Sequence, residues 1–152
     1  MIVDNDYAKK KLITFFKFPG VKKVVAENNF DELFSAWDKF RKADNSALTL
    51  RPHTLARFLE ECGIDWINYS TSIPDLTFWY YEEPTLFIPK NIKKIGKLPF
   101  RFSNLKEIHY EGTSDDFNKI QKPWDTHATF MNDDKEIKVI CSDGPWKRRF
   151  EL

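Results

Sequence analysis

The sequence contains few cysteines and no long apolar run. The two cysteines, Cys62 and Cys141, lie far apart, and no Cys-x-x-Cys pair occurs. The cysteine pattern therefore does not support a zinc knuckle or a redox pair, and we expect two buried, reduced thiols. No apolar stretch approaches the length of a transmembrane helix, and the run at residues 12–16 is too short for a signal peptide. We expect a soluble, cytoplasmic protein that does not bind a membrane.

Neither sign of charge is in excess. The chain has 24 Lys and Arg against 23 Asp and Glu, a net charge of +1, and both kinds are spread over all its parts. A DNA mimic needs a large acidic excess, and binding by phosphate neutralisation needs a clustered basic face. The charge pattern argues against both, while 41% apolar and 16% aromatic residues predict a folded chain with a core.

Common catalytic and metal-binding motifs are also missing. The chain has no glycine-rich phosphate loop, HExxH pair, nucleophile elbow or EF-hand loop. Its three histidines, His53, His109 and His127, are isolated in sequence, so none has an evident catalytic partner. We therefore expect no enzymatic activity, no bound metal and no cofactor.

The first half of the chain is predicted to be helical. Apolar residues recur at helical spacing, and turn residues separate the periodic segments. Helices are predicted over the ranges 6–18, 21–27, 30–42 and 49–62. The third has acidic residues in its first turn and basic residues near its end, as the helix dipole favours. These three or four helices and the connector after them form the first predicted domain, residues 1–84.

The connector at residues 65–83 is rich in aromatic residues. It contains Trp66, Tyr69, Phe78, Trp79, Tyr80 and Tyr81. Two interpretations stay open for these rings. They can pack at the seam between two lobes, or they can form an exposed contact patch, since Trp and Tyr contribute strongly to binding.

From residue 86 the apolar pattern changes from helical to alternating. Leu86 and Ile88 match Ile108 and Tyr110 at a shift of about 22 residues, and a third strand is predicted at 137–140. This spacing predicts short parallel strands stacked coil upon coil. Between the first two strands, the inward-facing residues that fill the coil are expected to be Ile92, Ile95, Phe100, Phe102 and Leu105. The predicted fold is α+β: residues 85–152 form a short solenoid of two or three parallel strands, capped by the helical lobe.

The second half of the chain resembles the BspA-type leucine-rich repeat, roughly IPxxIxxIGxxAFxxCxxLxxI. The residues that carry this resemblance are Ile88, Pro89, Ile92, Ile95, Gly96, Phe100, Asn104, Leu105 and Ile108. The following segment resembles that family's terminal cap through Tyr110, Gly112, Thr113, Phe117, Trp124, Val139, Cys141, Asp143 and Gly144. Leu98-Pro99 and Phe102-Ser103 depart from the repeat pattern. Short chains with a helical head and one such coil also resemble bacteriophage accessory proteins.

The cap segment has local signals of its own. Thr113 and Asp116 predict a capping box at the start of a helix over 114–120. Phe117 is expected to face the end of the solenoid, and Trp124 is expected to lie flat over the last coil. His109 falls on the strand face opposite to the apolar residues and is expected to be exposed.

These features predict a non-enzymatic module that binds another protein. The resemblance implies a phage-encoded protein that binds or inhibits a host factor in the host cytoplasm. The candidate contact residues are Trp66, Tyr69, Trp79, Tyr80, Tyr81, His109, Trp146, Arg148 and Arg149. Three alternatives stay open: association of the basic, aromatic C-terminal tail with nucleic acid, self-association through sheet edges, and a small enzyme with its site at the lobe seam.

Overall fold

The computed structural model describes residues 6–43, 50–133 and 135–147, and it consists of two compact units. The first unit runs from Met1 to Ser70 and the second from Thr71 to Leu152. This boundary lies earlier than the one expected at residue 84. The reason is that residues 71–81 hydrogen-bond to the next pass of the chain, for example Phe78 N–H to the Pro99 carbonyl at 2.8 Å. The predicted capping of one unit by the other stays a prediction.

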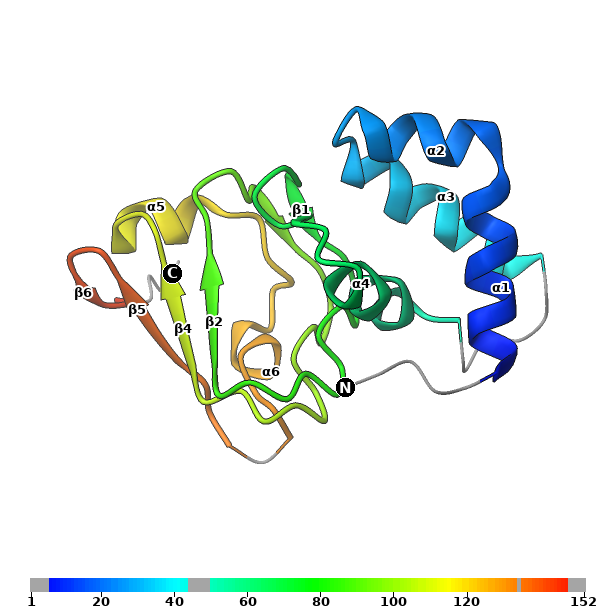
Figure 1. Ribbon diagram of the computed structural model, residues 1–152. Helices are drawn as coiled ribbons and strands as arrows, with labels where there is room; N and C mark the ends of the chain where they lie inside the picture. The colour runs from blue at the N-terminus through cyan, green and yellow to red at the C-terminus, as the bar shows by residue number, and fades with distance from the viewer. Residues whose placement is uncertain (1–5, 44–49, 134, 148–152) are drawn as a thin grey trace. The chain divides into compact units, whose positions relative to one another are not determined.

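The first unit is helical, as predicted (Figure 1). Its helices are α1 (Asp6–Lys17), α2 (Pro19–Ala26), α3 (Phe30–Lys42) and α4 (Pro52–Glu61). Helices α2 and α4 begin with a proline, which costs little in the first turn because an N–H there has no partner within the helix. The Asn29 side chain caps α3 by accepting a hydrogen bond from Glu32 N–H at 3.3 Å. The predicted start of the last helix, at residue 49, lies outside the described residues.

Aromatic rings form much of the core of the first unit. Trp37 is fully buried, and its ring centroid lies 5.0 Å from that of Phe15. The indole N–H of Trp37 donates to the Arg51 carbonyl at 3.3 Å, so its polar atom is satisfied. Trp66 is buried against Phe34, with ring centroids 5.1 Å apart. The expectation that both cysteines are buried is wrong for Cys62, which follows α4 and is exposed, while Cys141 is buried.

In its described residues the second unit contains two small sheets and two short helices, so the fold is of mixed α+β class (Figure 1). The first sheet pairs β1 (Ser72–Ile73) in parallel with β3 (Lys94–Ile95). The second has the order β2 (Thr85–Ile88), β4 (Glu107–Tyr110), β5 (Lys138–Cys141), β6 (Gly144–Pro145). Its first three strands are parallel, as predicted, and β6 is antiparallel.

The backbone of the second unit repeats its path at an interval of 22 residues. Leu86 pairs with Ile108 across β2 and β4, and Ser72 pairs with Lys94 across β1 and β3. A hydrogen bond from Lys97 N–H to the Asp75 carboxylate, 2.7 Å long, spans the same interval. The repeating path therefore begins near residue 72, within the segment that the sequence analysis treated as a connector.

The core of the second unit lies behind the apolar face of its strands. Ile92, Ile95, Phe100 and Leu105 are buried, as predicted. The Phe100 ring is stacked between Phe78, at 5.8 Å, and Phe130, at 6.0 Å. Phe102 was also expected inside, but 43% of its surface is exposed. Its backbone has a left-handed conformation, with φ at 57°, and the side chain projects outward.

The helices of the second unit are α5 (Ser114–Lys119) and α6 (Thr126–Thr129). The predicted capping box of α5 is confirmed, with Thr113 and Asp116 bonded to each other's backbone N–H at 3.1 Å. The prediction for Trp124 is wrong: it is 95% exposed. Trp146 instead packs on buried Phe117, with ring centroids 4.9 Å apart. Within the described ranges, no helix combines the length and apolar character that crossing a membrane requires.

Candidate interaction site

Three aromatic side chains of the second unit contact one another at its surface, and we call them the aromatic ladder. Tyr80 and Phe102 stack with ring centroids 5.8 Å apart and 16° between their planes. The edge of the Trp79 ring meets Phe102 at 5.1 Å. Tyr80 is 45% exposed, similar to Phe102, whereas Trp79 is half-buried. The two outer rings therefore offer a stacked apolar surface to solvent.

The ladder is a product of the 22-residue repeat. Tyr80 and Phe102 occupy equivalent positions, and both have left-handed backbone conformations, with φ at 64° and 57°. Leu76 and Leu98 form a second such pair, at 63° and 45°. A left-handed conformation costs a residue with a Cβ atom about 1 kcal/mol or more, and such strain is often found at functional positions.

The base of the ladder is anchored by hydrogen bonds. The Trp79 indole N–H donates to the Leu98 carbonyl at 2.8 Å. The backbone N–H of Leu76 donates to the Lys97 carbonyl at 3.1 Å, which ties the two passes of the chain together. These bonds fix the Trp79 ring and join the two chain segments that carry Tyr80 and Phe102.

A cation lies beside the ladder. The Arg101 guanidinium carbon is 5.3 Å from the Phe102 ring centroid, within cation–π range. Its Nε atom is also 3.9 Å from the Asp133 carboxylate, and the Arg101 side chain stays 44% exposed. The ladder thus combines two exposed rings with a guanidinium group, and aromatic residues and arginine are enriched at protein interfaces.

The solvent-facing side of the four-stranded sheet carries a second row of side chains. The strand register places Phe87 beside His109, His109 beside Ile140, and Ile140 beside Pro145. Phe87 and His109 are exposed, as the alternation in β4 predicted for His109. The His109 Nε2 atom lies 2.8 Å from the Glu107 carboxylate on the same strand. This row is mixed in character, with the polar His109 between apolar residues.

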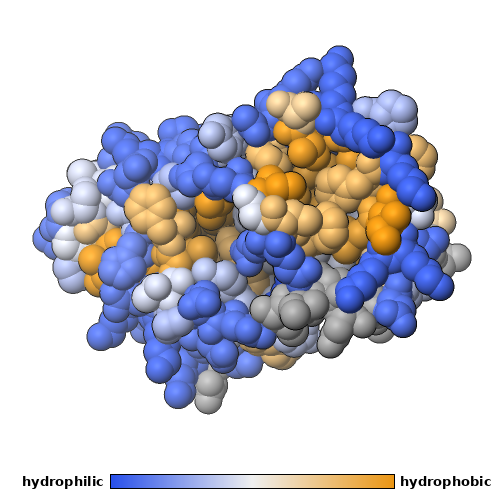
Figure 2. Space-filling view, viewed as in Figure 1, coloured by the Kyte–Doolittle hydropathy of each residue, from blue (hydrophilic) through white to orange (hydrophobic). Residues whose placement is uncertain are grey.

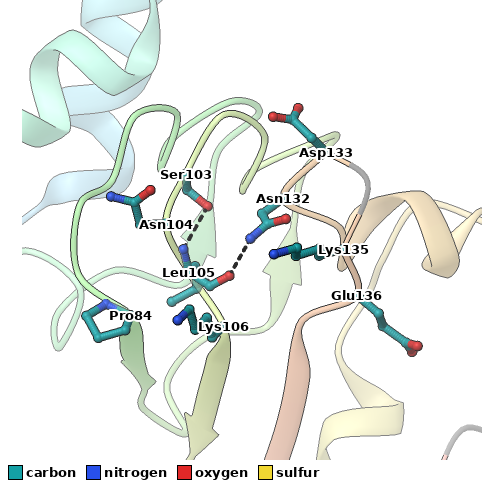
Figure 3. A pocket seen from close by; sticks show the side chains of 9 residues that line it. All are labelled: Pro84, Ser103, Asn104, Leu105, Lys106, Asn132, Asp133, Lys135 and Glu136. Atoms are coloured by element: carbon teal, nitrogen blue, oxygen red, sulfur yellow. Dashed lines mark hydrogen bonds between the residues drawn. The ribbon is translucent and has the colours of Figure 1, made fainter.

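A polar hollow of about 670 Å³ lies beside the ends of these strands (Figure 3). Two of its walls are joined by a hydrogen bond from the Asn132 amide to the Leu105 carbonyl, 2.8 Å long. The Leu105 N–H in turn donates to the Ser103 hydroxyl at 3.3 Å. Figure 3 shows the Glu136 carboxylate pointing away from these bonds. The hydrogen-bonding groups of Asn132 and Ser103 are thus engaged in holding the hollow together.

Two titratable groups of this unit, Lys122 and Cys141, have strongly altered pKa values. The Lys122 ammonium group lies 4.6 Å from the Phe117 ring centroid and 5.6 Å from that of Trp146. It donates to the carbonyls of Phe117 and of Ile120, the latter at 3.0 Å. Burial lowers the pKa of Lys122 to about 8, and burial raises the pKa of Cys141 to about 11. The Lys122 side chain therefore caps the C-terminal end of α5.

The described parts of the chain contain no group of three or more His, Cys, Asp or Glu side chains that could hold a metal ion. His53, in α4 of the first unit, is half-buried. Burial lowers its pKa to about 4, and the charges of Arg57 and Arg51 act in the same direction. The imidazole is therefore neutral in the folded protein at neutral pH.

The structure separates the predicted contact residues by their exposure. Trp66 is buried in the core of the first unit, so it is not available to a partner. Tyr81 and Trp146 are half-buried, and their polar atoms bond to the Thr85 carbonyl at 3.3 Å and to the Asn118 side chain at 2.9 Å. Three predicted residues are exposed: Tyr69, Tyr80 and His109. Arg148 and Arg149 lie outside the described residues, so the nucleic-acid alternative stays a prediction.

Of the predicted residues, the structure brings Trp79 and Tyr80 together in one surface cluster. Sequence reasoning missed the two residues that complete it, Phe102 and Arg101. A signal for Phe102 was present, because it follows Tyr80 by the interval of 22 residues that relates Leu86 to Ile108. Trp124 follows Phe102 by the same interval. However, Lys94 forms its β-bridge with Gln121 and not with the residue 22 positions later. The third repeat is therefore out of step with the first two, and Trp124 does not join the ladder.

No family model, characterised protein or solved structure matches the chain. The resemblance to BspA-type repeats and the bacteriophage source therefore stay predictions from the residue pattern. The function has to be inferred from the geometry of the described residues.

Proposed function

We propose that the second unit is a short leucine-rich-repeat-like solenoid that acts as a non-enzymatic protein-binding module. The parallel pairing of β1 with β3 and of β2 with β4 at one common interval supports a repeating architecture. The sequence from Ile88 to Ile108 also supports the proposal, because it resembles the BspA-type repeat. Such architectures act through their surfaces, which suits a chain in which catalytic motifs are missing from the sequence.

The aromatic ladder is the observation that carries this proposal. Tyr80 and Phe102 expose stacked rings from strained backbone positions, although polar residues there would be easier to accommodate. Arg101 supplies a guanidinium group at the edge of the stack. Rings held in place before binding lose little conformational freedom when a partner covers them, which favours affinity.

The charge beside the ladder favours a protein partner over a nucleic acid. Glu82 and Glu83 follow the ladder residues in sequence, and both are exposed. Carboxylates at this position would repel a phosphate backbone, whereas a protein surface can pair with them and with Arg101. If the chain is phage-encoded, as its resemblance implies, the partner would be a host factor in the host cytoplasm.

The test is a pull-down with the full chain from lysate of the native host cells. A Tyr80→Ser, Phe102→Ser double variant removes both exposed rings, and Tyr69→Ser removes one exposed ring from the other unit as the control. We expect the wild type and the control to retain a stoichiometric partner protein, and the double variant to bind that purified partner at least about tenfold more weakly. Equal binding by all three proteins, with circular dichroism showing them folded, would reject the ladder as the binding site.

A further inference from the structure

The helical unit has its own exposed apolar surface, distinct in residues from the aromatic ladder. Ile13 is 55% exposed and Phe18 is 49% exposed. Three more apolar side chains, Phe16, Phe40 and Phe58, are half-buried. Figure 2 shows hydrophobic residues gathered on the face of this unit that is turned toward the viewer, with hydrophilic side chains at their border. We call Ile13, Phe16, Phe18, Phe40 and Phe58 the apolar strip.

The aromatic members of the strip are connected by ring contacts. The Phe58 ring of α4 lies 5.1 Å from Phe16 of α1, and Phe16 lies 5.4 Å from buried Phe15. Phe15 contacts Phe40 of α3 at 5.3 Å, and Phe40 contacts Phe18 at 6.2 Å. The exposed Phe18 ring and the half-buried Phe58 ring are therefore parts of one aromatic cluster that includes the buried ring of Phe15.

Exposed lysines lie beside Ile13, the most exposed member of the strip. Helices α1 and α2, residues 6–26, contain six lysines and one acidic residue, Asp6. Residues three or four apart are neighbours on a helix surface, so Ile13 lies beside Lys9, Lys10 and Lys17. All three lysines are exposed. The apolar strip is thus combined with a local positive charge, although the whole chain is nearly neutral.

We propose that the apolar strip binds an acidic amphipathic helix of another protein. The apolar side of such a helix would cover Ile13 and the exposed ring edges, and its carboxylates would pair with Lys9, Lys10 and Lys17. Docking of an amphipathic helix on an apolar surface is a recurring mode of peptide recognition, and complementary charge fixes its orientation. This binding site is independent of the one proposed for the second unit.

Two other occupants suit the strip less well. A second copy of the chain would place one set of lysines against another, and like charges across an interface oppose association. A membrane would require apolar groups that insert below the level of the lipid headgroups. Phe16, Phe40 and Phe58 are half-buried among the helices, so within the strip only Ile13 and Phe18 are exposed enough to insert.

The probe for this site is a fluorescein-labelled helical peptide of about 18 residues, with Leu at helical spacing on one face and Glu elsewhere. A matched peptide has Lys in place of every Glu. Fluorescence anisotropy with the full chain measures both affinities over a range of salt concentrations. We expect the acidic peptide to bind in the micromolar range, more weakly at higher salt, and the basic peptide to bind at least about tenfold more weakly.

Two variants and a control locate the site. Ile13→Ser removes an exposed apolar side chain and is expected to weaken binding of the acidic peptide by about tenfold. Lys17→Glu is expected to weaken it by about three- to tenfold and to reduce its salt dependence. Lys106→Glu makes the same charge change at an exposed position of the second unit and is expected to leave binding unchanged. Circular dichroism at 222 nm verifies that each variant keeps its helices.

Four results would overturn the proposal. The first is the absence of binding of the acidic peptide, and the second is equal binding of the two peptides. The third is an affinity that Ile13→Ser leaves unchanged. The fourth is evidence for a different occupant of the strip. This would be a wild-type chain that sediments with phosphatidylserine vesicles but does not bind the peptide. It would also be a dimer, detected by light scattering, that Ile13→Ser dissociates.

Discussion

We predict that the half-buried His53 of the helical unit makes the stability of this unit sensitive to mild acid. His53 follows Pro52 in the first turn of α4, and its Nδ1 atom is shielded from solvent. Burial, with the charges of Arg57 and Arg51, lowers its pKa from 6.5 to about 4. Between these two values the unfolded chain binds a proton that the folded chain does not bind. The free energy of unfolding must therefore fall as the pH decreases from about 6.5 to about 4.

The size of this effect follows from the two pKa values. Each unit of pKa difference corresponds to about 1.4 kcal/mol, so the complete loss near pH 4 is about 3 kcal/mol. Between pH 7 and pH 5, the contribution of His53 decreases by about 2 kcal/mol. This is a large part of the net stability of a small domain. Above pH 7 the imidazole is neutral in both states, and no further change is expected from it.

Urea unfolding followed at 222 nm, which reports on the helices, measures this loss at pH 7 and pH 5. The His53→Gln variant has no imidazole at this position and should lose about 2 kcal/mol less than the wild type. Carboxylates protonate in both proteins, so their contribution cancels in the comparison. His127→Gln is the matched control, and it should lose as much as the wild type because His53 is intact. Equal losses for wild type and His53→Gln, or an NMR titration midpoint of His53 near 6.5, would refute the reasoning.

Three further predictions concern the second unit. If Tyr80 is strained by its left-handed backbone, Tyr80→Gly should be more stable than Tyr80→Ala by about 1 kcal/mol in urea unfolding, and equal stability would argue against strain. Phe117→Ala should destabilise the protein by about 3–5 kcal/mol because its ring is fully buried. Trp124→Ala should change the stability by less than about 0.5 kcal/mol because this side chain is exposed. The opposite order in thermal unfolding would contradict this assignment of core and surface. Because burial lowers the pKa of Lys122 to about 8, the unfolded chain binds more protons than the folded chain between about pH 8 and pH 10.5, so the contribution of Lys122 to stability rises with pH there. Lys122→Met should lack this rise, and an identical pH profile in both proteins would show that Lys122 is not the cause.

Elements that depend on neighbouring residues could be predicted from the sequence. The apolar spacing in α3 and the acidic residues in its first turn placed that helix at its observed bounds. The Thr113 and Asp116 side chains identified the start of α5, because a capping box requires only residues three positions apart. The parallel register of β2 and β4 followed from the repeat of apolar pairs at 22 residues.

Elements that depend on few residues or on distant contacts were missed. Strands β1 and β3 have two residues each, which is too short for an alternating pattern to be recognised. Helix α6 has four residues and was missed for the same reason. In the candidate site, Trp79 and Tyr80 were identified by residue type, but Phe102 was assigned to the core because its apolar character alone favours burial.

The sequence by itself determined where the helices and the longer strands lie and at what interval the second unit repeats. These features depend on periodicity and on side chains close together along the chain. Only the tertiary structure decided which aromatic rings are core and which are surface. Trp146 reaches back to cover Phe117, so Trp124 is left exposed. A left-handed backbone turns Phe102 outward onto Tyr80. Whether a ring is buried depends on contacts between residues far apart in sequence, and residue type alone does not specify them.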